Sequence, residues 1–129
     1  MKSIIITDNA PAPVGPYNQA VKSGDLLFVS GQIAIDPPTG TLVTENIEDE
    51  TNQVMKNIAA ILSTAEMSFE NVVKASVFVT DMNLYSRINA VYANYFDEST
   101  APARELVEVA NLPKFVNVEI SVIAVEAKQ

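Results

Sequence analysis

The sequence predicts an α+β fold in which two helices cover one face of a β-sheet. Two segments, around residues 47–65 and 84–96, repeat apolar residues at the spacing of one helix face. The other apolar segments are short, rich in Val, Ile and Phe, and bounded by Gly, Pro, Asn or Asp, which is typical of strands. Because strands both precede and follow each helix, we expect one α+β domain spanning residues 1–129.

The first forty residues predict short strands separated by loops and turns. The loop is marked by three prolines and a glycine, and the turns by Gly, Asp and Pro. In order, the predicted elements are a strand at 2–6, a loop at 7–16, hairpin strands at 17–21 and 26–30 around a turn at 22–25, extended chain at 31–35, and a turn at 36–40.

The first helix is predicted to begin at Asn46, a residue type suited to the N-cap. An acidic run follows in the first turn, at residues 48–50, where the helix dipole favours negative charge. We interpret this run as a helix terminus and not as a metal site. The buried face is expected to contain Val54, Ile58, Ile61 and Ala65, and residues 68–71 to form a turn.

The second half predicts a mostly apolar, central strand at 72–80 and then a helix with Asp81 and Asn83 as candidate caps. Segment 97–102 ends this helix, and strands at about 103–110 and 117–125 follow. One sheet face then lacks a helical cover, which favours a homo-oligomer. The apolar stripe of the helix, whose aromatic residues we interpret as core, consists of Leu84, Ile88, Val91, Tyr92, Tyr95 and Phe96.

Composition excludes several classes of function. The chain has no His and no Cys, so it has no Ser-His triad, no thiol nucleophile and no common zinc site. Its formal charge of −8 disfavours nucleic acid as a partner. No apolar run approaches the roughly 20 residues that span a bilayer. The apolar run at the start of the chain is also too short for a signal-peptide core, so we expect a soluble, cytoplasmic protein without membrane partners.

Arg104 and Glu119 are the most unusual charged residues. The chain has two arginines, and the other, Arg87, lies in a helical pattern with ordinary surface neighbours. Arg104 and Glu119 instead lie in successive apolar strand segments, where an unpaired charge is costly to bury. They could form a structural ion pair, be separately solvated, or belong to a functional site.

Five motifs, in order, resemble the Rid family of imine deaminases (YjgF-like proteins), and within it the RidA subfamily. Together they extend from about residue 10 to 125. The matching residues are Gly15-Pro16-Tyr17-Asn18-Gln19-Ala20, Phe28-Val29-Ser30-Gly31-Gln32, Val77-Phe78-Val79-Thr80-Asp81, Pro102-Ala103-Arg104, and Leu112-Pro113-Lys114 with Val118-Glu119-Ile120.

The resemblance implies a chorismate-mutase-like fold with a mixed sheet and two helices on one face. It also implies a homotrimer with ligand sites in clefts between subunits. The implied reaction is hydrolysis of 2-iminobutanoate or 2-iminopropanoate to a 2-oxo acid and ammonia, without a cofactor or a metal. Such imines arise from enamines that pyridoxal-phosphate-dependent dehydratases release.

The resemblance assigns a role to each matching residue. Arg104 would clamp the substrate carboxylate, because a guanidinium offers a planar, two-pronged donor. Glu119 would hold and activate the attacking water. Further substrate contacts would come from Tyr17, Ser30, Gly31, Asn89 and the backbone of Leu106.

Three departures from the family pattern bear on the pocket. Leu106 stands where a cysteine is common, and the segment between Phe96 and Pro102 is short and lacks an aromatic residue before the proline. Glu105 directly follows Arg104, and strand alternation predicts that its side chain points to the opposite face.

Three other functions remain for comparison. A non-catalytic sensor of small carboxylates would need Arg104 but not Glu119, so the presence of Glu119 favours the enzyme. An RNA-directed nuclease is disfavoured by the charge and by the lack of a basic stripe. A chorismate mutase would need several cations for its dianionic substrate, and only one arginine is well placed.

Overall fold

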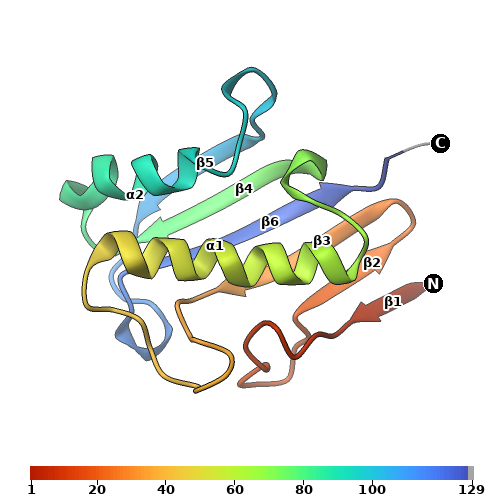
Figure 1. Ribbon diagram of the computed structural model, residues 1–129, viewed down its shortest axis with the longest axis horizontal. Helices are drawn as coiled ribbons and strands as arrows, with labels where there is room; N and C mark the ends of the chain where they lie inside the picture. Colours follow the sequence, from red (N-terminus) through yellow and green to blue (C-terminus); the bar gives the residue numbers. More distant parts are fainter. Residues whose placement is uncertain (128–129) are drawn as a thin grey trace.

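Six strands form one sheet, and two α-helices pack against it, in a computed structural model that describes residues 1–127 (Figure 1). This arrangement confirms the predicted α+β class. The elements are β1 (Lys2–Ile5), β2 (Ala20–Ser23), β3 (Leu26–Gln32), α1 (Ile47–Thr64), β4 (Val72–Val79), α2 (Tyr85–Ala93), β5 (Ala103–Glu108) and β6 (Val118–Val125). Short 3₁₀ turns occupy Phe69–Asn71, Met82–Leu84, Glu98–Thr100 and Pro113–Phe115.

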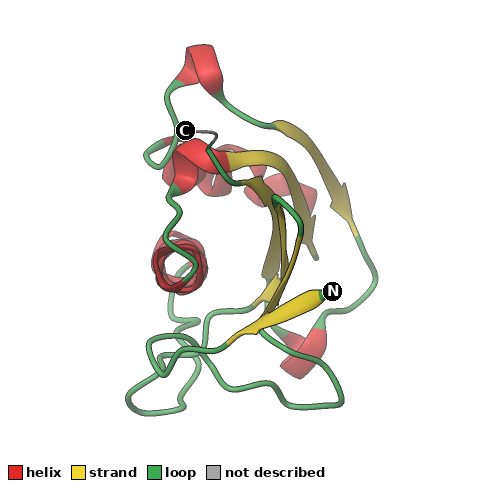
Figure 2. Cartoon of the chain, turned by 90° about the vertical axis from the view of Figure 1, so that its right-hand side faces the viewer, coloured by secondary structure: helices red, strands yellow, loops and turns green. Residues whose placement is uncertain are grey.

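The sheet is mixed, with the strand order β1-β2-β3-β6-β4-β5. Only β4 and β5 run parallel, and α2 connects them, as a parallel pair requires a crossover. All other neighbouring strands are antiparallel. Both helices lie on one face of the sheet, and its other face is uncovered (Figure 2).

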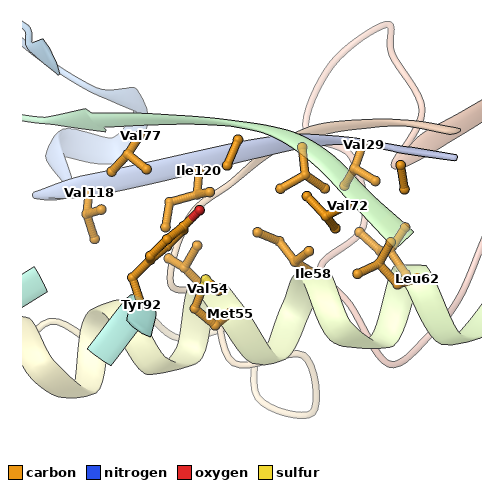
Figure 3. Close-up of a cluster of buried hydrophobic side chains, with 14 of the residues drawn as sticks. Val29, Val54, Met55, Ile58, Leu62, Val72, Val77, Tyr92, Val118 and Ile120 are labelled. Atoms are coloured by element: carbon orange, nitrogen blue, oxygen red, sulfur yellow. The ribbon is translucent and has the colours of Figure 1, made fainter. Parts of the chain in front are cut away.

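The core lies between the sheet and α1 (Figure 3). Val54, Ile58 and Ile61 are fully buried, as predicted for this face of α1, while Ala65 is the C-cap and only half-buried. Along β6 buried and half-buried residues alternate, because one strand face meets the helices and the other does not. The first turn of α1 is acidic, yet one of its residues, Glu50, is also buried in this core.

Glu50 is fully buried and joins α1 to the start of β6. Its Oε2 accepts hydrogen bonds from the backbone N–H groups of Asn117 (2.7 Å) and Val118 (3.3 Å). Its Oε1 accepts a third from Asn117 Nδ2 (2.7 Å). These donors compensate the cost of burying a carboxylate. The residue thus fixes the strand position that immediately precedes Glu119.

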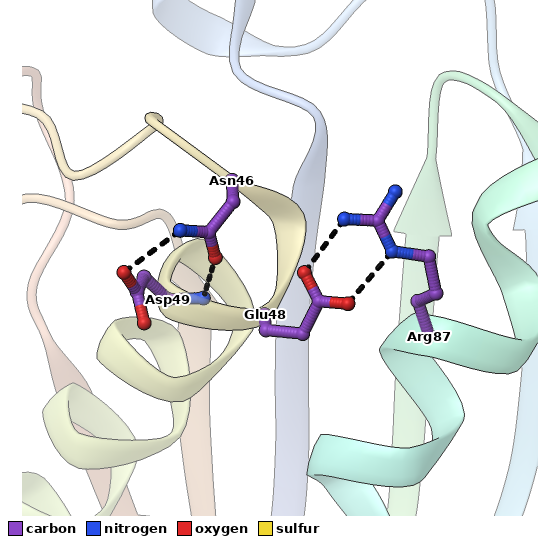
Figure 4. A network of polar contacts seen from close by, with 4 residues as sticks. All are labelled: Asn46, Glu48, Asp49 and Arg87. Carbon is purple, nitrogen blue, oxygen red and sulfur yellow. Dashed lines mark hydrogen bonds and ion pairs between the residues drawn. The ribbon is translucent and has the colours of Figure 1, made fainter.

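The N-terminus of α1 is capped as predicted: Asn46 Oδ1 accepts a hydrogen bond from the Asp49 N–H at 2.8 Å. Arg87 is an exposed residue of α2, as predicted, but its partner could not be foreseen. Its Nε and Nη2 each donate to Glu48 at 2.7 Å, so a two-pronged surface ion pair links α2 to α1 (Figure 4). The two partners are 39 residues apart, which is why sequence spacing did not indicate the pair.

The predicted strand at 17–21 begins late, at Ala20. β1 ends at Ile5, which pairs with Ala20, so residues 17–19 have no partner in β1. The Gln19 carbonyl still accepts a hydrogen bond from the Ser30 N–H of β3 at 2.9 Å, while the Gln19 side chain bonds to the preceding loop. Its side chain donates to the carbonyls of Thr7, Ala10 and Pro11 and accepts from the Thr7 N–H at 2.8 Å.

The second predicted helix is shorter than expected. Asp81 caps the 3₁₀ turn Met82–Leu84, and α2 ends at Ala93, before the last aromatic residues of the predicted stripe. Tyr95 and Phe96 nevertheless pack into the core, with both rings 5.2 Å from that of Phe69. The aromatic cluster therefore forms as predicted, although partly outside a helix.

The uncovered sheet face carries large apolar side chains. Phe28 is 43% exposed and pairs across the sheet with Ile123, while Val107 is 42% exposed and lies beside Phe78. Such a patch is typical of an interaction surface. No helix within residues 1–127 is long and apolar enough to cross a membrane.

Candidate functional site

Arg104 lies on β5 and is held by two residues of α2. Its Nη1 donates to Asn89 Oδ1 at 2.8 Å, and its Nη2 donates to the hydroxyl of Tyr85 at 3.2 Å. The guanidinium carbon lies 4.9 Å from the centre of the Tyr92 ring, within the range of a cation–π contact. The guanidinium is therefore fixed in orientation by neutral groups.

No carboxylate of residues 1–127 forms an ion pair with Arg104. The guanidinium lies at a pocket of about 560 Å³ that also contains Asn89, Tyr92, Ala93, Phe96, Glu98, Ala101 and Pro102. A half-buried, preoriented cation with free donors favours an anionic ligand. Burial in the same region raises the pKa of Tyr92, while the charge of Arg104 partly opposes this shift.

Glu119 lies on β6 beside Gly31 of β3. A Cβ at residue 31 would be 2.5 Å from Glu119 Oε2 and 2.8 Å from its carboxyl carbon, so only glycine leaves space for this carboxylate. Burial raises the pKa of Glu119 above its ordinary value. A carboxylate with a raised pKa is a better general base than a fully solvated one.

A cavity of about 60 Å³ adjoins Glu119. Its walls include Gly31, Tyr17, Lys114 and the proline-rich loop of residues 11–14. A water molecule needs roughly 10–15 Å³ of such space. The cavity is thus large enough for water next to the carboxylate, but small for a complete substrate with its side chain.

The hydroxyl groups of Tyr17 and Ser30 make different hydrogen bonds. The Tyr17 hydroxyl accepts a hydrogen bond from the Val14 N–H at 3.3 Å and so connects the cavity wall to the loop. Ser30 Oγ donates to the Asn18 carbonyl at 2.6 Å, and Ser30 is not among the residues that line the cavity. Within one chain, Ser30 supports the loop at Tyr17.

Arg104 and Glu119 face opposite sides of the sheet. Arg104 is in register with Ala75 of β4, which is buried under the helices. Glu119 is in register with Phe78, three positions further along β4, and therefore on the uncovered face. The two residues do not form the structural ion pair that the sequence left open.

The predicted site residues consequently fall into two groups. Arg104 and Asn89 are in contact, and Leu106 lies on the same sheet face, in register with the buried Val77. Glu119, Gly31 and Tyr17 surround the smaller cavity. One described chain does not bring the two groups together.

Glu105 points away from the guanidinium, as predicted. Its carboxylate accepts a hydrogen bond from Ser76 Oγ and pairs with Lys74 Nζ at 3.0 Å. The Ser76 hydrogen bond, followed by that of Lys74, lowers the pKa of Glu105. The extra acid therefore forms its own network on the uncovered face and does not neutralise Arg104.

Two supports of Arg104 were not anticipated from the sequence. Tyr92 was interpreted as a core aromatic and Tyr85 was given no role, yet both contact the guanidinium. Together with Asn89 they recur at spacings of four and three residues, which places them on one face of α2. That spacing was the available signal. Among residues 1–127, no group of three or more acidic side chains is arranged to hold a metal ion.

Comparisons with known proteins agree with these motifs. The family described as Endoribonuclease L-PSP matches residues 7–126. A RutC family protein of Pyrococcus horikoshii is 53% identical over 124 residues, covering 96% of this chain and 98% of its own. The 2-iminobutanoate/2-iminopropanoate deaminase of Salmonella typhimurium is 45% identical over 127 residues, covering 97% of this chain and 98% of its own.

The fold is also similar to those of solved structures. The TdcF protein of E. coli, whose crystal structure holds bound serine, superposes with a TM-score of 0.91 at 42% identity, covering 97% of this chain and 99% of that one. Serine carries an α-carboxylate, so at least one protein of this fold binds a small carboxylate ligand.

Proposed function

This chain belongs to the Rid (YjgF/RutC) family, and on that premise we propose that it hydrolyses 2-imino acids to 2-oxo acids and ammonia. The observation that carries the proposal is the guanidinium of Arg104, which is oriented by Asn89 and Tyr85 and has no anionic partner within residues 1–127. The substrate carboxylate would be that partner. The smallest substrates are 2-iminopropanoate and 2-iminobutanoate.

The site would be completed by a second copy of the chain. Arg104 and Glu119 lie on opposite sheet faces, so one chain cannot apply both to the same small molecule. The apolar residues of the uncovered face supply a surface on which copies can pack, and we propose a homotrimer with one site in each cleft. Each cleft would receive Arg104 from one subunit and Glu119 from its neighbour.

In the reaction, Arg104 would fix the carboxylate and thereby the adjacent C=N bond. Glu119 accepts a proton from water, whose oxygen bonds to the imine carbon while the nitrogen is protonated. Glu119 returns its proton to the nitrogen of the tetrahedral carbinolamine, which expels ammonia, and the hydroxyl proton is lost to solvent as the C=O bond forms. The sum is imine plus water giving 2-oxo acid plus ammonia, with no change of oxidation state and no need for a cofactor.

The activity is tested by coupling the protein to a threonine dehydratase and following 2-oxobutanoate while semicarbazide competes for free imine. We expect 2-oxobutanoate to form faster than in the spontaneous reaction. Arg104→Ala should abolish the acceleration, and Arg104→Lys should restore little of it, because an ammonium keeps the charge but lacks the two-pronged geometry. An unaccelerated reaction with wild-type protein excludes the proposed enzyme.

The shared site is tested by mixing two inactive variants. Arg104→Ala and Glu119→Gln subunits are unfolded together and refolded at equal amounts. Random assembly gives roughly a quarter of the clefts an intact Arg104 from one chain and an intact Glu119 from another. We therefore expect about that fraction of wild-type activity. If mixtures stay as inactive as the separate variants, the two residues do not act from different chains.

A sensor that binds small carboxylates without catalysis is the alternative. It would need the Arg104 pocket, whereas the half-buried carboxylate of Glu119 with its raised pKa is specifically useful for moving a proton. Binding of 2-oxobutanoate by wild type and by Glu119→Gln, together with lack of turnover by both, would identify the sensor. The nuclease activity in the family's description fits poorly with a net charge of −8.

A further inference from the structure

The two strands beside β6 hold Glu119 unequally. On one side, β4 and β6 form an antiparallel ladder in which Phe78 lies opposite Glu119. On the other side, pairing between β3 and β6 ends at Gln32 and Ile120, so Glu119 has no partner in β3. A shift of β6 by one residue would turn the Glu119 side chain to the opposite face of the sheet. The place of this carboxylate therefore depends on what fixes the start of β6.

The buried carboxylate of Glu50 fixes that start from outside the sheet. It accepts hydrogen bonds from the N–H and Nδ2 of Asn117, each at 2.7 Å, and from the Val118 N–H at 3.3 Å. The Asn117 carbonyl accepts another from the N–H of Thr80, which directly follows β4, at 3.2 Å. The residue two positions before Glu119 is thus bonded through its N–H, its carbonyl and its side chain at once.

The turn before β6 is an unfavourable one. Lys114 and Phe115 have φ angles of 55° and 56°, in the left-handed region that residues with a side chain rarely adopt. Such conformations persist only where the surrounding structure holds them. The hydrogen bonds of Glu50 begin two residues after this turn, at Asn117. Without them, the turn could relax by moving the start of β6.

Glu50 is itself held firmly. It is fully buried in the first turn of α1, where the helix dipole favours a negative charge. It forms no ion pair within residues 1–127, so three N–H donors compensate its charge in place of a cation. In the part of the chain that the structure describes, every hydrogen bond of this side chain goes to Asn117 or Val118.

We propose that Glu50 is a positioning residue for Glu119. Its hydrogen bonds to the start of β6 fix the register and direction of that strand, and so keep the Glu119 carboxylate in the space beside Gly31. Because Glu50 is fully buried, it acts through the strand and not on the substrate. This inference rests on the proposed role of Glu119 as base, and it makes α1 a part of the site.

Two variants separate the geometry of Glu50 from its charge. In Glu50→Gln, the amide oxygen can accept from both backbone N–H groups, and the Asn117 side chain can turn over so that its oxygen accepts from the new amide. All three hydrogen bonds are then kept without the charge, so kcat should stay near that of wild type. Glu50→Asp keeps the charge but is one methylene shorter and cannot reach the same donors. Its kcat should fall roughly 10- to 100-fold.

Asn71→Ala is the matched control, because Asn71 Nδ2 donates to the Val125 carbonyl at 3.0 Å, at the other end of β6. The coupled assay is run well below the melting temperature of each variant, so that all of the protein is folded. The control should melt earlier than wild type but keep its kcat. Calorimetry should show 2-oxobutanoate binding to Glu50→Asp nearly as tightly as to wild type, because Arg104 is untouched. Wild-type kcat in Glu50→Asp, or an equal loss in Glu50→Gln, overturns the positioning role.

The titration of Glu119, followed by carboxyl-detected NMR, tests the same inference without activity. Burial holds the pKa of Glu119 above its ordinary value. In Glu50→Asp this pKa should move towards the ordinary value, because a displaced strand start exposes the carboxylate to water. It should stay in place in Glu50→Gln and in Asn71→Ala. If wild type hydrolyses no imine, the catalytic proposal fails, and the titration alone decides: an unchanged pKa in Glu50→Asp shows that Glu50 does not position Glu119.

Discussion

Gly31 and Glu119 occupy neighbouring strands so closely that a Cβ on residue 31 would lie 2.5 Å from Glu119 Oε2. The position of the candidate base, Glu119, therefore depends on residue 31 having no side chain. This relationship connects the second family motif to the last one, and it makes the role of Gly31 steric.

Gly31→Ala should displace the Glu119 carboxylate and lower imine hydrolysis roughly 10- to 100-fold, because small errors in placement are costly in catalysis. Gly15→Ala is the matched control, since its Cβ would meet the Tyr17 ring at an ordinary 3.5 Å. Steady-state kinetics with the coupled assay measures both. Wild-type activity in Gly31→Ala would show that Glu119 need not occupy its present position.

The raised pKa of Glu119 predicts opposite effects on activity and stability. As base it must be ionised, so activity should fall as the pH drops through a pKa above the ordinary glutamate value. Because burial raises the pKa of Glu119 in the folded state, its contribution to stability is fully present below the pKa of the unfolded state. This contribution is lost as the pH rises through the folded-state pKa. Glu119→Gln should therefore be inactive yet melt at a higher temperature at pH 7.

The same comparison at acidic pH should show no gain in melting temperature for Glu119→Gln, because wild-type Glu119 is then protonated. Glu45→Gln, at an exposed position, controls for the loss of one negative charge. A lower melting temperature of Glu119→Gln at pH 7 would mean that the carboxylate is stabilised by contacts that outweigh its burial.

The Glu48–Arg87 pair predicts an unusual acid titration. The hydrogen bonds from Arg87 lower the pKa of Glu48 to about 2. Carboxyl-detected NMR should show that midpoint in wild type and a value in the ordinary range in Arg87→Ala. Because the folded pKa is depressed, the stability from this pair is present above the ordinary glutamate pKa and is lost as the pH falls towards about 2.

Two tyrosine hydroxyls predict contrasting stability changes. The Tyr92 hydroxyl is buried without a hydrogen-bond partner within residues 1–127, and the Tyr95 hydroxyl donates to Asn52 Oδ1. Tyr92→Phe should leave the free energy of unfolding unchanged or raise it, whereas Tyr95→Phe should lower it by about 1 kcal/mol. Urea unfolding at equal protein concentration compares them, and a large loss in Tyr92→Phe would reveal a missing partner.

The sequence was sufficient for features that depend on local pattern. The Asn46 cap, the buried face of α1 and the outward direction of Glu105 follow from residue spacing within one element. Arg104 was identifiable as an exceptional charge because the surrounding strand is apolar. These predictions need no knowledge of which elements are neighbours.

Features that depend on the order of strands could not be read in the same way. The sequence placed Arg104 and Glu119 in successive strand segments, yet β4 lies between those strands and the two side chains face opposite sides. The hydrogen bonds of Glu50 to Asn117 join residues 67 positions apart. Such contacts arise only after the helices and strands have packed together.

The position of β6 has a consequence for how the chain is synthesised. β6 is the last strand in sequence, yet it lies inside the sheet between β3 and β4. Until residues 118–125 have left the ribosome, the strands β1-β2-β3 cannot be joined to β4 and β5, because β6 is the strand that pairs with both β3 and β4. The segment that carries the candidate base Glu119 is therefore also the one that joins the two parts of the sheet.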